Sequence, residues 1–519
     1  MAGDEGRSER GLSRREFGAG LAGLGVAALM ARPATGQTPA RGGRLRVAMA
    51  GSSPNDTLDP HKAVTALDAS RCQQLYSRLV YLEPTLKPGG ELAESFEPNR
   101  SGDEWVFKLR RGITFHDGRP LTVKDVIYSF ERLRAKETAS PAKVLFDQIA
   151  ADGLRADGDH TLRVKLTASN ADFAALLTGY HACVVPDGTT DFGKGIGTGP
   201  FKLKTFRPGV GSVFERNPSY WRSGRPYVDE VEIFGIADAV ARTNALMAGE
   251  VHLVEKLDPA AVARVKATPS LRVLAARSGF HGTFHMQTDQ PPFDNPDVRL
   301  ALKHLIDRER FVEIVFKGYA QVGNDHPVPP NDPYYCRELP LRAYDPDRAK
   351  ALLKKAGHEN LTLELHASTI LPGMMEGALV FKEHAAKAGV TINIVRQPSD
   401  GYWSNVWLKK PFAVGGWTMR PVPDIILSQA YVSTAKWNET HWKRPAFDKL
   451  VDDARATTDQ AERYRLYCQA QRMIHEDGGV IVPAFSDVLD AGLARVQGFQ
   501  LHPVGTLGHW RYEGLWLSA

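Results

Sequence analysis

The chain has 519 residues, of which 43% are hydrophobic, 24% charged and 9% aromatic. This composition excludes a collagen, a coiled coil and a wholly disordered chain, and at about 100–200 residues per domain it predicts two to four lobes. The 65 basic and 60 acidic residues leave a net charge of +5. Because that balance lacks the clustered Lys and Arg that phosphate contacts need, we expect no nucleic-acid partner. A mean hydropathy of −0.30, without a long apolar run, excludes a polytopic membrane protein.

Residues 1–36 have the pattern of a twin-arginine-like secretory signal peptide. Arg14 and Arg15 precede a weakly apolar stretch over residues 18–31, and the small residues 34–36 offer a cleavage site. The stretch is shorter than the roughly 20 residues of a transmembrane helix, and a disordered basic tail is the alternative. No cysteine stands at the end of the stretch, since the first is Cys72, so no lipid anchor is expected. We therefore predict cleavage near residue 36 and a periplasmic protein of a Gram-negative cell.

Four cysteines lie more than 100 residues apart, at Cys72, Cys183, Cys336 and Cys468. This spacing excludes a zinc ribbon and a thioredoxin-like motif. An oxidising compartment permits one long-range disulfide, and buried free thiols are the alternative. Of the two, we favour buried free thiols.

Strands and helices follow one another from the start of the mature chain. Residues 44–49 alternate polar and apolar side chains, which predicts a half-buried strand. Near-helical spacing of apolar residues predicts a helix over 66–81, and alternation predicts a strand over 105–109. A helix is expected over 122–134, with Thr122 as its N-cap.

The C-terminal half shows a β-α-β rhythm. The predicted elements are a helix over 345–357, a strand over 361–365, a helix over 374–388, a strand over 390–395 and a helix over 461–476. Strands that alternate with helices predict an α/β fold with a largely parallel sheet. In such folds the ligand crevice lies at the strand ends.

No motif points to catalysis, since the chain lacks a nucleophile elbow, an H-E-x-x-H pair and a Walker A loop. Residues 195–200 are rich in glycine, but Pro200 stands where a phosphate loop would need a basic residue. We therefore predict a turn that enters a strand at 201–203. His281 and His285 fall on one predicted strand, about 13 Å apart at ~3.3 Å per residue, too far to share a metal ion. We expect no enzyme, catalytic residue, metal or cofactor; a periplasmic hydrolase whose triad comes from distant residues is the alternative.

Several sequence blocks carry a family resemblance. The densest is WVFKLRRGITFHDGRPLT at 105–122, and TLDPH at 57–61 and LAESFEP at 92–98 precede it. The later blocks are GTGPF at 197–201, NPSYW at 217–221, LMAGEV at 246–251, VRLAL at 298–302 and YDPDRAKALL at 344–353. Together they resemble the family 5 extracellular solute-binding proteins of ABC importers, which bind peptides, nickel chelates, opines and related solutes. The blocks keep the family's order from about residue 44 to 485.

This resemblance implies an α/β, periplasmic binding protein-like fold of type II (cluster C), with two hinged lobes and an inserted extra domain. The implied parts are a discontinuous lobe I (41–80, 190–278 and 486–519), an inserted domain II (81–189) and a closing lobe III (279–485), with hinges near 278–279 and 485–486. The implied function is a non-catalytic monomeric receptor that captures a small solute by hinge closure and delivers it to permease subunits in the inner membrane. A receptor of the same fold that senses its ligand without transport is the alternative.

The run GGWTMRPVPD at 415–424 predicts the ligand's charge. In dipeptide and oligopeptide receptors of the resembled family, an Asp two or three residues after the Trp pairs with the peptide amine. Here Met419 and Arg420 occupy those positions after Trp417, and a guanidinium pairs with carboxylates. We predict a carboxylate-bearing ligand: an opine-like solute, a modified peptide or an anionic metal chelate. An ordinary dipeptide or oligopeptide, and an Arg420 salt bridge within the protein, are the alternatives; Asp424 stands where a nickel receptor would be expected to carry a His-containing segment.

Aromatic residues gather in the same region. Six of them fall within 41 residues: Tyr402, Trp403, Trp407, Trp417, Trp437 and Trp442. Pocket walls are mostly apolar and aromatic, so we expect Trp403 and Trp417 to form the walls. From the opposite lobe, the loop over 52–57 offers hydroxyl and backbone N–H groups. The predicted ligand-binding residues are Ser53, Thr57, Tyr402, Trp403, Trp417, Met419, Arg420 and Asp424.

Overall fold

A mixed 12-stranded sheet organises the computed structural model, which describes residues 38–518. The predicted signal peptide and its cleavage site lie outside the described residues. The strands of this sheet are β1 (Arg44–Met49), β10 (Phe201–Arg207), β11 (Gly211–Arg216), β12 (Glu230–Gly235), β13 (Leu253–Val254), β14 (Leu271–Met286), β15 (Ala320–Val322), β16 (Thr362–Ala367), β17 (Thr391–Arg396), β18 (Phe412–Trp417), β19 (Val480–Ile481) and β20 (Ala484–Leu493). Their order is β10-β11-β12-β1-β13-β20-β14-β18-β16-β17, with β15 beside β20 and β19 beside β14.

A smaller four-stranded sheet has the order β5-β6-β8-β7. The strands outside the main sheet are β2 (Ser77–Arg78), β3 (Val80–Leu82), β4 (Pro88–Gly90), β5 (Ala93–Pro98), β6 (Glu104–Leu109), β7 (Ile149–Ala156), β8 (Thr161–Leu166), β9 (Cys183–Val184), β21 (Val496–Gln497) and β22 (Trp516–Leu517). The α-helices are α1 (Ala66–Leu75), α2 (Val123–Arg134), α3 (Lys143–Phe146), α4 (Phe173–Leu176), α5 (Ala239–Met247), α6 (Val262–Lys266), α7 (Pro296–Lys303), α8 (Arg308–Phe316), α9 (Pro346–Lys355), α10 (Met374–Ala386), α11 (Tyr402–Asn405), α12 (Pro423–Ala430), α13 (Pro445–Ala456), α14 (Gln460–Asp477) and α15 (Thr506–His509). Among residues 38–518, no helix is long and apolar enough to cross a bilayer.

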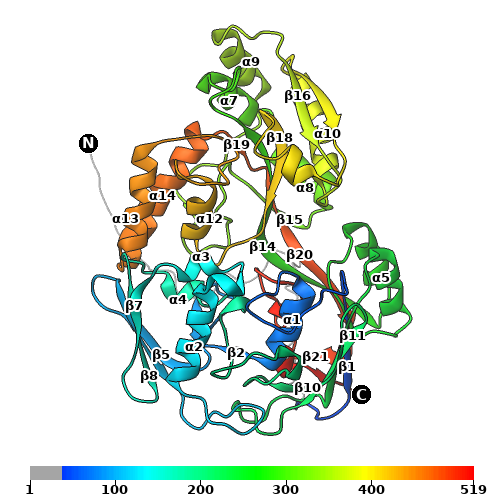
Figure 1. The fold of residues 1–519 in the computed structure, drawn as a ribbon. Helices are drawn as coiled ribbons and strands as arrows, with labels where there is room; N and C mark the ends of the chain where they lie inside the picture. The colour runs from blue at the N-terminus through cyan, green and yellow to red at the C-terminus, as the bar shows by residue number, and fades with distance from the viewer. Residues whose placement is uncertain (1–37, 519) are drawn as a thin grey trace, which may run out of the picture. The chain divides into compact units, whose positions relative to one another are not determined.

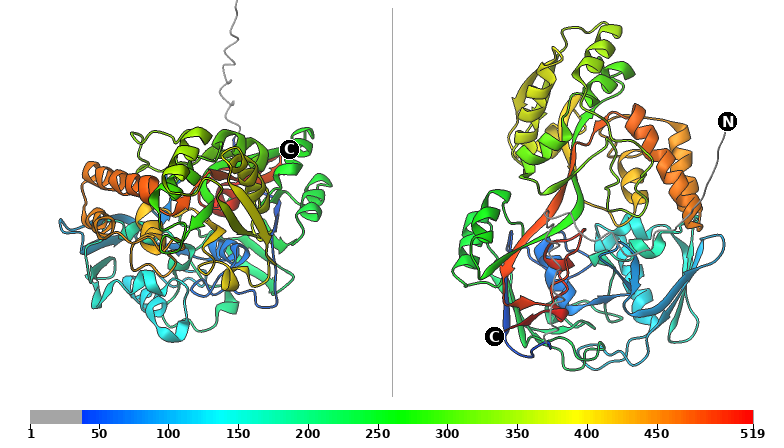
Figure 2. Two further views of the ribbon diagram at one scale, coloured as in Figure 1. Left: turned by 90° about the horizontal axis from the view of Figure 1, so that it is seen from above. Right: turned by 180° about the vertical axis from the view of Figure 1, so that it is seen from behind.

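Strands β14 and β20 run side by side through the centre of the main sheet, as Figures 1 and 2 show from opposite sides. They pair antiparallel from Leu271 with Leu493 to His281 with Phe485. The register shifts between Ala276 and Phe280, and beyond that point β14 pairs with β18. A register irregularity bends a strand locally, so the shift marks a place where the two halves of the sheet change direction.

Four hydrophobic cores fill the layers around these sheets. Representative buried residues are Val47, Leu75 and Ile233 in the first core, Phe284, Leu365 and Phe381 in the second, Phe107, Phe130 and Leu162 in the third, and Leu427, Phe447 and Tyr467 in the fourth. The first core lies on β1 and β12, and the second packs α8 and α10 against β16. The third fills the small sheet under α2, and the fourth joins α12, α13 and α14. Each core is built on its own set of helices and strands.

The structure confirms most of the predicted elements and corrects three points. The strands predicted from 44, 105, 201, 361 and 390 are β1, β6, β10, β16 and β17, and the helices predicted from 122, 345, 374 and 461 are α2, α9, α10 and α14. The Asp125 carboxylate accepts a hydrogen bond from the backbone N–H of Thr122 at 2.8 Å, which fixes the start of α2. The helix predicted over 66–81 is too long, because α1 ends at Leu75 and residues 77–82 form β2 and β3. The sheet is parallel at β16 with β17 and β18, as predicted, but it is mixed as a whole.

The glycine-rich segment before β10 is a structural turn. A Cβ atom at Gly199 would lie 2.3 Å from the backbone oxygen of Gln74, and one at Gly197 would lie 2.1 Å from that of Leu75. Only glycine allows this approach to the end of α1. The predicted turn into a strand is therefore confirmed.

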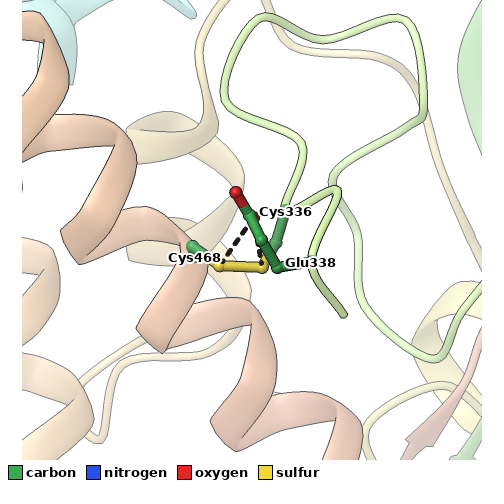
Figure 3. A group of neighbouring side chains, drawn as sticks. All are labelled: Cys336, Glu338 and Cys468. Atoms are coloured by element: carbon green, nitrogen blue, oxygen red, sulfur yellow. Dashed lines mark hydrogen bonds between the residues drawn. A yellow bond between two sulfur atoms is a disulfide. The ribbon is translucent and has the colours of Figure 1, made fainter. Parts of the chain in front are cut away.

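The third correction concerns the cysteines, since Cys336 and Cys468 form a disulfide that closes 132 residues of chain (Figure 3). It ties the loop between β15 and α9 to helix α14. Glu338 lies beside both sulfur atoms and accepts a hydrogen bond from the Tyr464 hydroxyl at 2.8 Å. The free-thiol prediction is therefore wrong for this pair. It is confirmed for the other two, Cys72 and Cys183, which are buried and free.

Candidate functional site

Three loops meet at one edge of the main sheet. Strand β16 runs parallel to both β17 and β18, so the carboxyl ends of the three strands point the same way. The segments that follow them are 368–373, 397–401 and 418–422. Ligands of α/β sheets bind at this kind of edge. The predicted ligand-binding residues between 402 and 424 lie at or after the ends of β17 and β18.

A pocket with an empty volume of about 270 Å³ opens at the end of β18. That volume includes open solvent, and the space enclosed by the lining residues is about 10 Å³, room for about one water molecule. The lining residues come from β14, from the loop between β15 and α9, and from the run after Trp417: Gly279, His281, Pro327, Val328, Pro329, Asp332, Thr418, Met419, Arg420, Val422, Pro423 and Ile426. The structure therefore brings Met419 and Arg420 together in one cavity, and it adds His281 and Asp332.

Arg420 is a half-buried cation without a carboxylate partner in residues 38–518. Its Nε donates a hydrogen bond to Oε1 of Gln429 at 3.2 Å, and Nη1 donates to the Thr418 hydroxyl. Burial lowers the pKa of Arg420, which shows that its charged form lacks solvation. The alternative prediction is an Arg420 salt bridge within the protein. The described part of the chain contains no such ion pair. The guanidinium keeps capacity to bind an anion.

Met419 joins this pocket to the crossing strands. Its Sδ accepts a hydrogen bond from the backbone N–H of Gly279 at 3.1 Å. The side chain also packs with Leu82 and Leu86 in a small buried cluster. Met419 therefore contacts β14 at its register shift, two residues before the segment that pairs with β18.

His281 and Asp332 are buried polar residues of the same pocket. Nδ1 of His281 lies 2.8 Å from the Gly279 carbonyl oxygen, which assigns the proton to Nδ1 and leaves Nε2 as an acceptor with no partner. Burial lowers the pKa of His281 to about 4, so the ring is neutral at pH 7. Burial raises the pKa of Asp332 to about 7, although its carboxyl accepts a hydrogen bond from the Tyr334 N–H at 2.8 Å. Sequence reasoning missed Asp332, because nothing in its local pattern separates it from an ordinary loop aspartate.

Four indole rings form a second feature, which we call the Trp cluster: Trp403, Trp407, Trp417 and Trp437. The ring centroid of Trp407 lies 5.7 Å from that of Trp403, 5.9 Å from that of Trp417 and 6.3 Å from that of Trp437. Trp417 is buried, whereas Trp403 and Trp437 are 38% and 45% exposed. Large exposed indoles beside a ligand edge are available for contact.

The remaining predicted residues are engaged elsewhere. The Tyr402 hydroxyl is buried and donates to the Val414 carbonyl oxygen at 2.7 Å, which is a structural role. The Asp424 carboxylate is paired with Arg455, with Nε to Oδ1 at 2.9 Å. Ser53 and Thr57 serve their own loop: the Ser53 N–H donates to Asp56, and the Thr57 hydroxyl accepts from the Asp59 N–H, both at 3.0 Å. No hydrogen bond within 38–518 links this loop to residues 417–424.

The fold and the pocket at the sheet edge define a two-lobed solute-binding protein. Residues 87–439 match the sequence profile of the bacterial extracellular solute-binding proteins, family 5 Middle, and the chain belongs to this family. The predicted family, fold class and receptor class are confirmed.

Characterised relatives cover most of the chain. The glutathione-binding protein GsiB of Pectobacterium atrosepticum is 27% identical, over 86% of this chain and 90% of its own. The dipeptide-binding protein of Escherichia coli is 28% identical, over 85% and 89%. The heme-binding protein A of Haemophilus influenzae is 29% identical, over 85% and 87%. All three are named as binding proteins for a small solute.

Solved structures of other proteins share the fold of this chain. The periplasmic binding protein DppA of Helicobacter pylori, in complex with the peptide STSA, is similar with a TM-score of 0.75 at 25% identity, over 92% of this chain and 99% of its own. HbpA2 of Haemophilus parasuis has a TM-score of 0.81 at 24% identity, over 92% and 100%. Both place this chain among the type II periplasmic binding proteins.

Proposed function

We propose that the solute captured by this ABC-importer binding protein carries at least one carboxylate, and that Arg420 binds it. The observation that carries the proposal is the half-buried guanidinium of Arg420, which lines the pocket without a carboxylate partner in residues 38–518. A desolvated cation is costly until an anion pairs with it, and a guanidinium can hold a carboxylate through two parallel hydrogen bonds. A carboxylate ligand would complete the site.

The relatives and the neighbouring charges support this class of ligand. Glutathione, dipeptides and heme, for which three relatives are named, all carry carboxylates. The alternative, an ordinary peptide held by its amine, would require a free carboxylate in the loop after Trp417 or the carboxyl group of Asp332, which lines the same pocket. Asp424 is the acidic residue of that loop, and Arg455 already neutralises it. The opine-like, modified-peptide and anionic-chelate classes all satisfy the proposal.

Capture is proposed to follow from closure about β14 and β20. Lobe I would comprise 41–80, 190–278 and 486–519, with domain II (81–189) inserted, and lobe III (279–485) would close over it. The register shift between Ala276 and Phe280 lies beside the expected hinge at 278–279, which supports this division. A ligand that touches both faces stabilises the closed state. The exported chain, cleaved near residue 36, would act as a non-catalytic monomer and deliver its solute to permease subunits.

The test begins with mass spectrometry of the solute that co-purifies, followed by calorimetric titration of that solute and of its methyl ester. We expect the ester and the Arg420→Ala variant each to lose at least tenfold in affinity, and Arg420→Lys to lose less. Arg310→Ala is the matched control, because Arg310 is exposed and paired with Glu313 on the surface. Unchanged affinity of Arg420→Ala for the acid would overturn the proposal.

Two alternatives are separated by their own assays. Sustained product formation from any bound solute would show that the protein is a periplasmic hydrolase and not a receptor. Uptake of labelled solute by cells, with and without the permease, separates import from sensing without transport.

A further inference from the structure

A buried carboxylate lies beneath the Trp cluster. Glu439 is 2% exposed and accepts three hydrogen bonds. The donors are Nε1 of Trp407 at 2.6 Å, Nε1 of Trp417 at 3.1 Å and the Thr283 hydroxyl at 2.8 Å. Two indoles therefore direct their N–H edges at one anion.

No lysine or arginine neutralises Glu439 anywhere in the described chain. Its one basic neighbour is His285, whose Nδ1 lies 3.5 Å from Oε2. Burial lowers the pKa of His285, so this imidazole is neutral at pH 7. The carboxylate and the indoles around it keep a net negative charge.

The backbone makes room for this arrangement. Gly415 of β18 pairs with Thr283 of β14. A Cβ atom at Gly415 would lie 2.5 Å from Oε2 of Glu439 and 2.6 Å from the Thr283 hydroxyl oxygen. A larger residue at this position would displace the carboxylate from the two indoles.

Two rings of the Trp cluster, Trp403 and Trp437, are exposed to incoming groups. Trp403 stands at 89° and Trp437 at 55° to Trp407, and Trp437 stands at 46° to Trp417. Indole faces are electron-rich, and the N–H bonds to Glu439 increase that density in Trp407 and Trp417, which pack against the two exposed rings. The exposed rings of Trp403 and Trp437 therefore attract cations.

We propose that the Trp cluster binds an alkylated ammonium group of the same ligand whose carboxylate pairs with Arg420. This inference rests on the proposed function. Alkylation is favoured because clustered aromatic rings recognise alkylated ammonium groups, which need no hydrogen-bond acceptor. The ligand is then a zwitterion of the betaine class. Trp417 connects the two groups of residues, since Arg420 follows it by three residues in the chain and Glu439 accepts a hydrogen bond from its indole nitrogen.

The experiment compares three probes by calorimetric titration of the intact protein. They are a trimethylammonium carboxylate (carnitine), its neutral tert-butyl isostere and the corresponding tertiary amine lacking one methyl group. We expect the trimethylammonium probe to bind at least tenfold more tightly than the isostere, and to exceed the tertiary amine as well. Equal binding of the isostere would overturn the inference, because the cluster would then be an apolar wall only.

Variants separate the two proposals. Trp437→Leu, at an exposed position, should weaken the trimethylammonium probe at least tenfold, and Trp437→Phe should retain much of the binding because it keeps an aromatic face. Trp437→Leu should leave carboxylate-only probes unchanged, whereas Arg420→Ala should weaken both kinds. Binding of carboxylate-only probes through Arg420, with no gain from the ammonium group, would overturn this inference and leave the proposed function standing. If Arg420→Ala does not weaken binding of the trimethylammonium probe, the proposed function is overturned instead.

Discussion

Arg463 of α14 and Asp172, the residue before α4, form a buried ion pair between segments 291 residues apart. The guanidinium also lies over the Tyr334 ring, 5.0 Å from its centroid. Beside this pair, the Ala171 N–H donates to the Arg455 carbonyl oxygen at 2.8 Å. The fourth core is therefore tied to the domain of the small sheet by a buried ion pair and a backbone hydrogen bond.

Breaking this pair should destabilise the protein. Arg463→Met leaves the Asp172 carboxylate buried without its cation, and we expect a loss of about 3–5 kcal/mol in the free energy of unfolding. The double variant Asp172→Asn/Arg463→Met should recover part of the loss, because no charge is then left unpaired. Chemical denaturation of the three proteins gives the values. A double variant as unstable as the single one would show that packing of Arg463, and not charge, dominates.

Removing Arg420 should change the stability little, in contrast to its effect on binding. Arg420→Ala loses two hydrogen bonds of about 1 kcal/mol each, but it also removes a desolvated cation, so we expect a net change within about 1 kcal/mol. The control is Arg455→Ala, which strands the buried carboxylate of Asp424 and should cost at least about 2 kcal/mol. Urea denaturation without ligand checks both. A large loss for Arg420→Ala would mean that the residue has a structural role.

Asp332 predicts a pH dependence with a defined sign. Burial raises the pKa of its carboxyl to about 7 in the folded protein, from about 3.9 in the unfolded chain. Between these values the folded state binds more protons, so the contribution of Asp332 to stability falls as the pH rises from 4 to 7. Asp332→Asn should match the wild type near pH 4 and exceed it by about 2–4 kcal/mol at pH 8. Denaturation curves at several pH values measure the difference, and a difference that does not vary with pH would contradict the prediction.

Reduction of the disulfide should also lower the stability. Closing 132 residues of chain removes entropy from the unfolded state, and the loss of the bond should cost about 2–5 kcal/mol. A reductant should therefore lower the denaturation midpoint of the wild type. It should not affect the Cys336→Ser/Cys468→Ser variant, because Cys72 and Cys183 hold no disulfide to reduce. Equal sensitivity of both proteins would point to a different target of the reductant.

Local patterns predicted those elements whose partners follow closely in the chain. Alternation identified β16 and β17, and the Asp-Pro start identified α9. The end of α1 could not be predicted in this way. Residues 77–78 leave the helix because they pair with residues 183–184, more than 100 positions later. The pairing of Cys336 with Cys468 escaped prediction for the same reason.

In the site, too, the local features could be predicted from the sequence and the long-range contacts could not. The reversed charge at Arg420 and the density of indoles were visible in the sequence, and the structure brings Met419 and Arg420 together in one pocket. The role of Tyr402 was not visible, since its hydroxyl bonds a carbonyl oxygen that only the folded strand presents. Glu439 lies in an unremarkable loop sequence, and its importance arises from two indole nitrogens, one of them 32 residues away.

The two free thiols, Cys72 and Cys183, are buried, and burial raises the pKa of the Cys183 thiol to about 12. Both are therefore protonated and shielded from maleimide reagents in the native protein. A single cysteine introduced on either side of the crossing strands can accordingly carry a fluorescent dye or a spin label without background reaction. The distance between two such labels would record the swing of the halves directly, one molecule at a time.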